Sequence, residues 1–377
     1  MIEATLCSAD SHFVEPPDIF ERYLPRRLQE HAPRMELQTD SDGVGQHVWT
    51  FEGNFVTPLG GGAPRRGVQD QGNREFRALW SEIDPAAYEP HAYTDALLAD
   101  GVGLAIVQPT TGLVLWRVPD SELLTALFRA QNDHMVDFCS GRPDMLKGVA
   151  CLNVDDVSVA CAELRRCRDL GLVAALIPVH PGAAGSYSDP RYDELWSTAQ
   201  ELETPLFMHV ATVRPQAPTA SGMSTLALTP GLRSVREYWV RLSLADIIFG
   251  RVFDRFPRLR VGSVEHEAGW VPFWLDTMDW TYTQREVLTG GWRSASGQLP
   301  SEIFRTNMFA TFIEDDLAVA LRHRIGVDNL MWGNDFPHTE SSWPESRSLV
   351  DKLMSGVSVA ERASMTSVNV SRLLGLG

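Results

Sequence analysis

The chain has 377 residues, of which 44% are hydrophobic and 22% are charged, and this balance is typical of a folded rather than a disordered protein. Its formal net charge of −16 argues against a nucleic-acid partner, because neutralising phosphates requires a basic surface. No run of about 18 apolar residues occurs, so we expect neither a membrane-spanning helix nor a membrane partner.

The cysteines and the N-terminal residues indicate where the protein works. Five cysteines are present and no C-x-x-C pair occurs, so neither a disulfide framework nor a structural zinc site is expected. The first residues lack the basic and then apolar pattern of a secretory signal. We therefore expect a reducing compartment and a cytoplasmic location.

Short apolar runs rich in β-branched residues recur along the chain, and amphipathic stretches separate most of them. We predict strands at residues 5–9, 104–108, 147–152, 173–179, 205–208, 260–265, 308–313 and 330–333. We predict helices at residues 121–140, 156–170, 190–202 and 235–256. Apolar strands that alternate with helices are typical of a parallel sheet covered on both sides.

The predicted fold class is α/β, a (β/α)₈ TIM barrel formed by residues 1–377 as one domain. An open, doubly wound sheet is the alternative. Residues 13–95 are too long for a plain loop, so we expect an insertion after the first strand, either a cap over the barrel mouth or a solvated decoration. Residues 211–234 form a second long connection that could border the mouth.

Polar side chains stand at the ends of several predicted strands, where barrels place their active sites. Asp10 and His12 follow the first strand, and their i, i+2 spacing directs both to one side. His209 follows the fifth strand, and Asp335 follows the eighth. Carboxylate and imidazole are common ligands of zinc and manganese. We predict one divalent metal held by these four residues, Zn²⁺ in preference to Mn²⁺.

Each of these residues alone also has an ordinary structural explanation. A histidine after an apolar run is often a satisfied core residue, and Asp335 could be a turn residue because Pro337 follows. The prediction of a metal site depends on their joint position at the ends of strands one, five and eight. Glu265 and His266 stand in the same position after strand six.

Four segments of the chain are distinctive: ADSHFVEPPDIF at 9–20, PLFMHV at 205–210, FDRFPRLRVGSVEHEAGWVPFWLDTMD at 253–279 and LMWGNDFPHTESSWPES at 330–346. They resemble the amidohydrolase superfamily, in the branch that contains aminocarboxymuconate semialdehyde decarboxylase. The resemblance implies that Asp10, His12 and His209 bind the metal. It implies a catalytic role for His266, and both metal binding and proton transfer for Asp335.

Two departures from the superfamily patterns bear on the chemistry. The common first motif is H-x-H, and the D-x-H form found here is similar to that of resorcylate-type decarboxylases. The fourth predicted strand carries no lysine, so the resemblance implies one metal rather than two bridged by a carbamylated lysine.

We therefore predict a metal-dependent, non-oxidative decarboxylase of a small aromatic or unsaturated carboxylic acid. One alternative is a metal-dependent hydrolase of an amide, ester or lactone, which would activate a water with the same residues. The other is a barrel that binds metal without catalysis. The expected partners are a small-molecule substrate and, since homo-oligomers are common, a second copy in a homodimer.

Substrate contacts and the state of His266 complete the expectations. Arg214 could clamp a carboxylate or be a solvated loop charge. Trp270 could form an aromatic wall or pack in the barrel, and His338 could support the site. Glu265 and Glu267 flank His266, so we expect a carboxylate partner to favour its imidazolium form.

Overall fold

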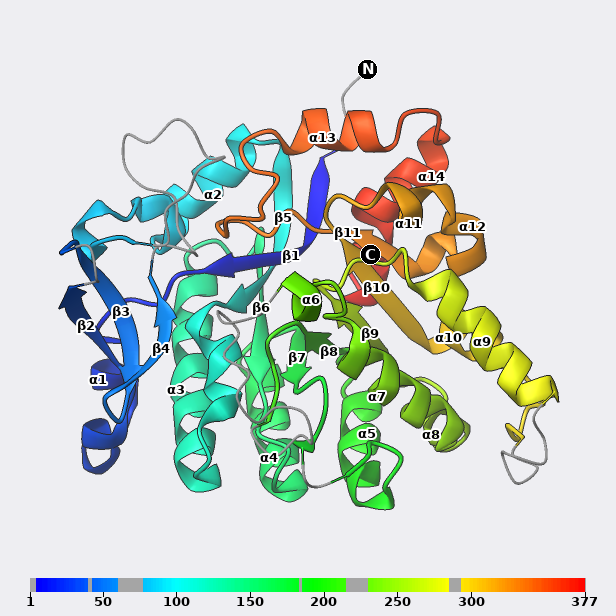
Figure 1. Cartoon of the computed structure of the whole chain (residues 1–377), viewed down its shortest axis with the longest axis horizontal. Coiled ribbons are helices and arrows are strands. Elements are labelled where there is room, and N and C mark those ends of the chain that lie inside the picture. The colour runs from blue at the N-terminus through cyan, green and yellow to red at the C-terminus, as the bar shows by residue number, and fades with distance from the viewer. Residues whose placement is uncertain are drawn as a thin grey trace.

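The computed structural model describes residues 5–39, 43–59, 77–182, 185–214, 230–284 and 293–376. Its central feature is an eight-stranded parallel sheet in the order β1-β5-β6-β7-β8-β9-β10-β11, curved into a barrel (Figure 1). The strands are β1 (Leu6–Phe13), β5 (Val102–Pro109), β6 (Leu146–Cys151), β7 (Ala174–Ile177), β8 (Leu206–His209), β9 (Val261–Val264), β10 (Met308–Phe312) and β11 (Leu330–Trp332). The eight predicted strands and the predicted (β/α)₈ barrel are confirmed.

Helices cover the outside of the barrel. They are α3 (Ser121–Ser140), α4 (Val157–Asp169), α5 (Asp193–Glu201), α6 (Pro230–Arg233), α7 (Tyr238–Phe249), α8 (Val252–Arg255), α9 (Val271–Gln284), α10 (Pro300–Asn307), α11 (Asp316–Ala320), α12 (Arg322–Ile325), α13 (Ser346–Leu353), α14 (Val359–Ala363) and α15 (Asn369–Leu373). Asp120 caps α3 by accepting a hydrogen bond from the Leu123 amide, and Asp156 caps α4 in the same way. The helix predicted over 235–256 is divided into α7 and α8, because Arg251 adopts a left-handed backbone with φ 59°.

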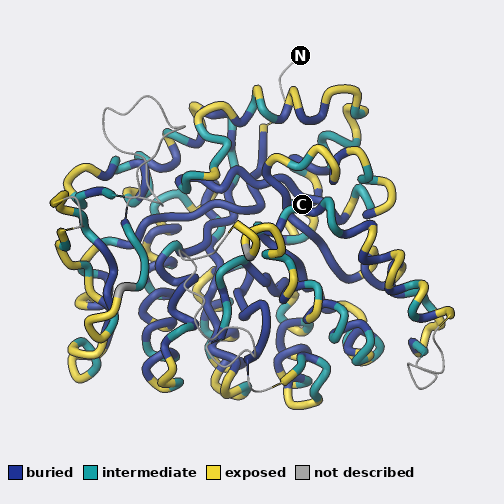
Figure 2. The backbone as a smooth tube through the Cα atoms, viewed as in Figure 1, coloured by how far each residue is buried: buried dark blue, intermediate teal, exposed yellow. Residues whose placement is uncertain are grey.

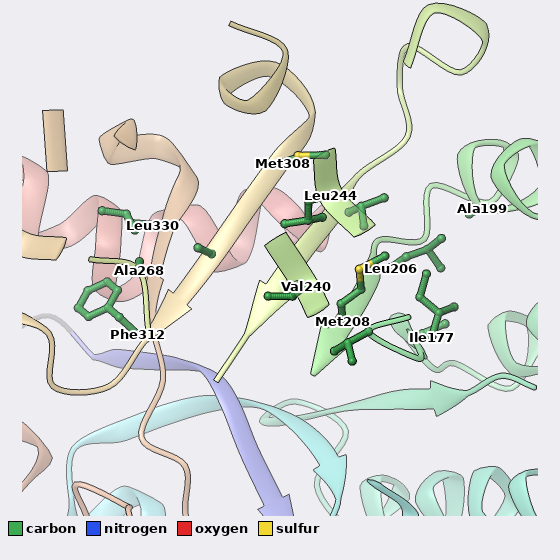
Figure 3. Close-up of a cluster of buried hydrophobic side chains, with 14 of the residues drawn as sticks. Ile177, Ala199, Leu206, Met208, Val240, Leu244, Ala268, Met308, Phe312 and Leu330 are labelled. Atoms are coloured by element: carbon green, nitrogen blue, oxygen red, sulfur yellow. The ribbon is translucent and has the colours of Figure 1, made fainter. Parts of the chain in front are cut away.

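The main hydrophobic core lies between the strands and the helices that surround them. Leu206 and Met208 of β8 and Val240 and Leu244 of α7 are buried members of one apolar cluster (Figure 3). The strands are buried along their length, whereas the outer helices alternate buried and exposed faces (Figure 2). This burial on both sides explains why the strands are continuously apolar in sequence.

The inside of the barrel is also packed with side chains. The Phe207 and Phe309 rings, from β8 and β10, meet edge to face with centroids 5.2 Å apart. They meet across Gly262 of β9, where a Cβ would lie 2.1 Å from the Phe309 ring. Glycine at this position therefore lets two aromatic rings fill the interior.

The barrel closes at a seam between its first and last strands. The Asp335 amide donates a hydrogen bond to the Asp10 carbonyl at 2.8 Å, and the His12 amide donates to the Phe336 carbonyl at 2.6 Å. The buried Asn334 joins the two sides, because its amide donates to Ser8 Oγ and its Oδ1 accepts from the Ser11 hydroxyl. The seam thus fixes Asp10 and Asp335 relative to each other.

The insertion after β1 has structure of its own. It contains α1 (Ile19–Tyr23), an antiparallel sheet of β2 (Arg34–Thr39), β3 (Gly45–Phe51) and β4 (Asn54–Pro58), and the start of α2 (Pro90–Ala99). Trp49 of β3 joins the apolar cluster that includes Trp116, which lies in the 3₁₀ segment η5 (Thr111–Arg117) directly after β5. Residues 60–76, like 215–229 of the second long connection, lie outside the described residues. The cap over the mouth stays a prediction.

Candidate metal centre

A bulge in β1 directs the D-x-H pair into the barrel mouth. Between Ser8 and Ser11 the pairing of β1 with β5 shifts by one residue. Asp10 and His12 are both fully buried, and the His12 Nε2 lies 3.4 Å from Asp10 Oδ1. The prediction that both side chains face one site is therefore confirmed.

Backbone carbonyls orient His12 of the D-x-H pair and His209 of β8. His12 Nδ1 lies 2.9 Å from the Pro109 carbonyl, and His209 Nδ1 lies 2.8 Å from the Val210 carbonyl. A carbonyl only accepts hydrogen bonds, so Nδ1 carries the proton in both rings. Each Nε2 faces the centre, and in the neutral ring its lone pair is available to a metal, as in metal-binding histidines.

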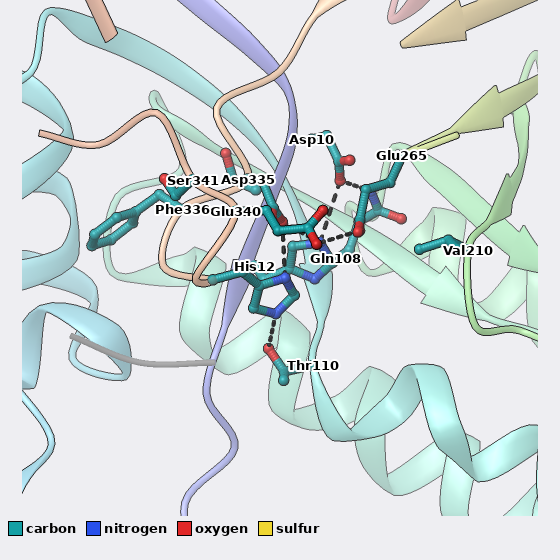
Figure 4. A network of polar contacts seen from close by, with 12 residues as sticks. Asp10, His12, Gln108, Thr110, Val210, Glu265, Asp335, Phe336, Glu340 and Ser341 are labelled. Atoms are coloured by element: carbon teal, nitrogen blue, oxygen red, sulfur yellow. Dashed lines mark hydrogen bonds and ion pairs between the residues drawn. The ribbon is translucent and has the colours of Figure 1, made fainter. Parts of the chain in front are cut away.

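Side chains from four strand ends form two overlapping groups that share His12 and Glu265 (Figure 4). His12 Nε2 lies 3.4 Å from Asp335 Oδ1, and His209 Nε2 lies 3.4 Å from Asp10 Oδ1 and 3.1 Å from Glu265 Oε2. Asp10, His12, His209 and Glu265 each offer one ligand atom within 4.8 Å of the others, as do His12, Glu265, Asp335 and His338. Three of the four predicted ligands thus lie in the first group, Asp335 lies in the second, and Glu265 and His338 join them.

Glu265 and Asp335 both owe their direction to an unusual backbone. Their φ angles are 60° and 53°, in the left-handed region that residues with side chains rarely adopt. Strain of this kind persists where the surrounding structure imposes it, and it gathers at functional sites. At Glu265 the left-handed turn ends the alternation of β9 and places this carboxylate in the cluster.

Among the residues that the structure describes, neither group of possible metal ligands includes His266. Its Nδ1 lies 3.1 Å from Ser263 Oγ, and its side chain is buried. Burial, with a further contribution from the positive charges of His209 and Arg236, lowers the pKa of His266 to about 3. The expected imidazolium form is therefore wrong, because burial outweighs the attraction of Glu265. The catalytic role of His266 stays a prediction.

His338 packs against the centre from the other side. Its ring stacks on His12 with centroids 3.9 Å apart, and its Nδ1 lies 2.8 Å from Asp335 Oδ1. Its Nε2 lies 3.0 Å from Thr110 Oγ1, whose hydroxyl donates to the Phe13 carbonyl at 2.7 Å. Because the single hydroxyl proton is used there, Thr110 accepts from Nε2–H, and the Nδ1 lone pair faces Asp335.

Burial in this charged centre shifts the proton affinities of its groups. Burial and the Glu265 carboxylate raise the pKa of Asp335 well above its usual range. Burial alone would also raise the pKa of Asp10, but the charges of His209 and His12 outweigh it and lower this pKa. Burial would lower the pKa of His209, and the Asp10 and Glu265 carboxylates instead raise it. The Asp10, Glu265 and Asp335 carboxylates thus lie close together, with fewer positive side chains beside them than are needed to balance their charge.

The donor atoms fit a divalent cation. Within the described residues, Asp10 Oδ2, Asp335 Oδ2 and the Nε2 atoms of His12 and His209 are buried without a hydrogen bond of good geometry. Buried polar atoms are rarely left so, and their convergence points to a missing positive partner. Gln108, at the end of β5, donates at 2.5 Å to Asp10 Oδ1, the oxygen that faces His12 and His209, and so fixes the carboxylate in the centre.

The two other proposed substrate contacts lie elsewhere at the mouth. The buried Arg214 guanidinium donates to the Trp116 and Val118 carbonyls at 2.6 and 2.9 Å and to Asp155 Oδ2 at 2.7 Å. These short bonds hold loops together and argue against a free carboxylate clamp. The Trp270 indole donates to the Glu267 carbonyl and packs on Trp274, outside the cluster.

A parallel eight-stranded barrel with a carboxylate–imidazole cluster at its strand ends has the architecture of the metal-binding (β/α)₈ proteins. The chain belongs to the amidohydrolase family, whose model, described as "Amidohydrolase", matches residues 46–376. The match begins after the D-x-H pair, so the structure is what links Asp10 and His12 to the rest of the family region. None of the helices in the described ranges has the length and apolarity needed to cross a bilayer.

Three known proteins illustrate the similarity. The gamma-resorcylate decarboxylase of a Rhizobium species is 25% identical over 278 residues, which cover 69% of this chain and 79% of that protein. An amidohydrolase from Mycobacterium avium subsp. paratuberculosis has a TM-score of 0.78 at 19% identity over the whole of both chains. A dihydroxybenzoic acid decarboxylase from Polaromonas, solved with manganese and 2-nitroresorcinol, has a TM-score of 0.65 at 17% identity, covering 99% of this chain and 97% of that one. The two structures share the fold of this chain.

Proposed function

We propose that this chain is a metal-dependent, non-oxidative decarboxylase of a small aromatic carboxylic acid. The observation that carries the proposal is the buried cluster of Asp10, His12, His209, Glu265 and Asp335 at the mouth of an amidohydrolase-family barrel. Relatives of this family named gamma-resorcylate decarboxylase support the reaction type. The D-x-H form of the first motif favours the same class.

Asp10, His12, His209 and Asp335 would hold a single divalent cation, with Glu265 as a further oxygen donor. When bound, such a cation would bind the substrate anion and stabilise negative charge that develops during the reaction. Our sequence prediction favours Zn²⁺. The third carboxylate, Glu265, makes the set richer in oxygen, which suits Mn²⁺, and a fold relative carries manganese. We propose Mn²⁺ as the alternative to test beside Zn²⁺.

Asp335 is the proposed proton donor. Its Oδ1 lies 2.8 Å from His338 Nδ1, so a proton can pass between these two residues. During the reaction the bond between the ring carbon and the carboxylate carbon breaks, and its electron pair stays on the ring carbon. CO₂ leaves, and the Asp335 proton forms the new C–H bond. Solvent must then return a proton to Asp335.

His338 and Gln108 position the reacting groups. His338, held by Thr110, places its Nδ1 2.8 Å from Asp335 Oδ1, where it would orient the carboxyl group. Gln108 holds one oxygen of Asp10. A positioned acid contributes about 10²–10⁴-fold in rate, so Asp335→Asn should lower turnover by at least that factor.

The test is CO₂ release by protein loaded with Mn²⁺ or Zn²⁺, from a panel of hydroxylated benzoic acids that includes 2,6-dihydroxybenzoate. We expect release from at least one acid, loss of release after chelation, and loss in Asp335→Asn. Hydrolysis of esters or amides without any CO₂ release would replace the proposal by the hydrolase alternative. Bound metal with no turnover of either kind would favour a non-catalytic barrel.

Two finer expectations accompany the proposal. A homodimer is expected from the frequency of such assemblies, and light scattering of the purified protein tests it. A cytoplasmic location is expected from the cysteine usage, and fractionation of cells tests it.

A further inference from the structure

The geometry points to Arg236 as the residue that recognises the anionic group of the substrate at the barrel mouth. This inference rests on the proposed function, because it assumes an aromatic carboxylate as the ligand. It moves the role of carboxylate clamp from Arg214, which the sequence suggested, to an arginine between α6 and α7, just beyond the long connection that carries Arg214.

An anionic substrate needs a cation at this entrance. The protein carries a net charge of −16, and Glu265 and Asp335 line the centre. Glu267 and Glu340 follow two residues after Glu265 and His338, so they bring further carboxylates to the loops after β9 and β11. A substrate carboxylate that approaches these groups is repelled unless a positive side chain meets it.

Arg236 lies between those two loops. Its Nη1 is 3.3 Å from Glu340 Oε2, and its Nη2 is 3.8 Å from Glu267 Oε1. Glu267 is itself fixed, since its Oε2 accepts from the Ile313 amide at 3.1 Å. The guanidinium therefore bridges the loops that carry Glu265 and His338, beside the candidate metal centre.

Arg236 is also accessible from outside the barrel. Its side chain is 20% exposed, so it is open to a ligand that enters from solvent.

The contacts of the two arginines suit different tasks. Arg214 makes three hydrogen bonds of 2.6–2.9 Å, two of them to backbone carbonyls. The Arg236 contact with Glu267 exceeds hydrogen-bond distance, and its contact with Glu340 is long. An incoming carboxylate can form two short parallel bonds with Arg236, which is the geometry that guanidinium groups favour.

The ion pair between Glu340 and Arg236 can break with little loss of stabilising energy. Glu340 also pairs with Arg233, whose side chain is 58% exposed, so its charge stays compensated when a substrate takes its place on Arg236. The substrate carboxylate thereby replaces the Glu340 carboxylate as the partner of Arg236, instead of replacing water alone. This exchange selects ligands that carry an anionic group.

The test compares aromatic acids with their methyl esters. Binding of 2,6-dihydroxybenzoate, benzoate and salicylate, and of the three methyl esters, is measured by calorimetry on the Mn²⁺-loaded protein. The variants are Arg236→Gln, Arg236→Lys and the matched control Arg233→Gln, which removes the other partner of Glu340. Metal content is measured for each protein, because Arg236 touches no proposed ligand and its loss should leave the metal in place.

We expect the wild type to bind at least one acid more tightly than its ester. Arg236→Gln should weaken binding of that acid by about 10- to 100-fold, the loss expected for a charge-assisted pair, and change ester binding by less than two-fold. Arg236→Lys should recover part of the loss. Arg233→Gln leaves Glu340 with Arg236 as its partner, so it should weaken acid binding by less than Arg236→Gln and leave ester binding unchanged.

Three results would overturn the inference. They are a wild type with no preference for any acid over its ester, an Arg236→Gln variant that binds the acid normally, and an equal loss of acid and ester binding. Failure of the proposed function is distinguishable, because it would appear as intact, Arg236-dependent acid binding without CO₂ release.

Discussion

Replacement of Gly333 by alanine tests how tightly the seam of the barrel holds the candidate metal centre. A Cβ at position 333 would lie 2.6 Å from Asp10 Cβ and 3.0 Å from the Asp10 amide nitrogen. Carbon atoms in good contact are about 3.5–4.0 Å apart, so β1 and β11 would have to separate by about 1 Å at this point. Backbone atoms of a buried strand cannot turn aside as a flexible side chain would.

The expected cost has two parts. Overpacking of this kind lowers the free energy of unfolding by about 1–3 kcal/mol. The same displacement stretches the 2.8 Å hydrogen bond from the Asp335 amide to the Asp10 carbonyl and moves the Asp10 carboxylate away from His209. Disturbing the support of a metal ligand typically costs about 10- to 100-fold in affinity, and we expect Gly333→Ala to fall in this range.

Urea unfolding and metal titration measure the two effects. Gly45→Ala is the matched control, because its Cβ would meet only Leu37 Cδ1 at an ordinary 3.5 Å. It should leave both quantities unchanged. If Gly333→Ala kept the stability and the metal affinity of the wild type, the close approach of β1 and β11 would not be what positions Asp10.

Four further outcomes follow from the structure. Glu265→Gln should weaken metal binding by about 10-fold or more, whereas His266→Gln should leave it intact; metal titration that shows the reverse would return His266 to the ligand set. Arg214→Met should lower the free energy of unfolding by about 2–4 kcal/mol in urea denaturation, because two carbonyls and the Asp155 carboxylate lose their hydrogen-bond partner. An unchanged free energy would show that these bonds are dispensable. Burial lowers the pKa of His134 to about 4, so the unfolded state takes up a proton at a higher pH than the folded state. The free energy of unfolding should therefore fall by at most about 3 kcal/mol as the pH drops from about 6.5 towards 4. In urea unfolding at pH 7 and pH 4.5, His134→Phe should reduce this fall, and equal losses in both proteins would contradict the assignment. Chelation should lower the unfolding free energy by about 2.7 kcal/mol relative to protein with metal at 100 times its Kd. A melting temperature that is the same with and without metal would mean that the cluster binds none.

The strands and the long helices were predictable because their patterns are local. Continuous apolar runs gave all eight barrel strands, and α3 begins and ends where its pattern does. The three strands of the insertion were missed, since β2 is largely exposed and lacks the apolar run that marks a barrel strand. The division of α7 from α8 depends on one left-handed residue, Arg251, which no periodicity reveals.

The candidate site shows the same limit more sharply. Alternation along β9 would direct Val264 and His266 to one side, which favours His266 as the inward residue. The left-handed backbone of Glu265 breaks that alternation and sends the carboxylate inward instead. Arg214 was a reasonable clamp by position, but its partners come from the loops after β5 and β6, and a sequence does not show such long-range contacts. Gln108 ends its strand beside Asp10 and could have been found by asking which residue holds that carboxylate.

The seam between β1 and β11 also sets an order of events during synthesis. Asp10 leaves the ribosome more than 300 residues before Asp335, and the two meet only when the last strand has docked beside the first. Until then the nascent chain carries only part of the candidate site, with the Asp10 carboxylate and His12 on an unpaired edge. A metal held as we propose would therefore bind only to the completed barrel, after the two ends of the sheet have joined.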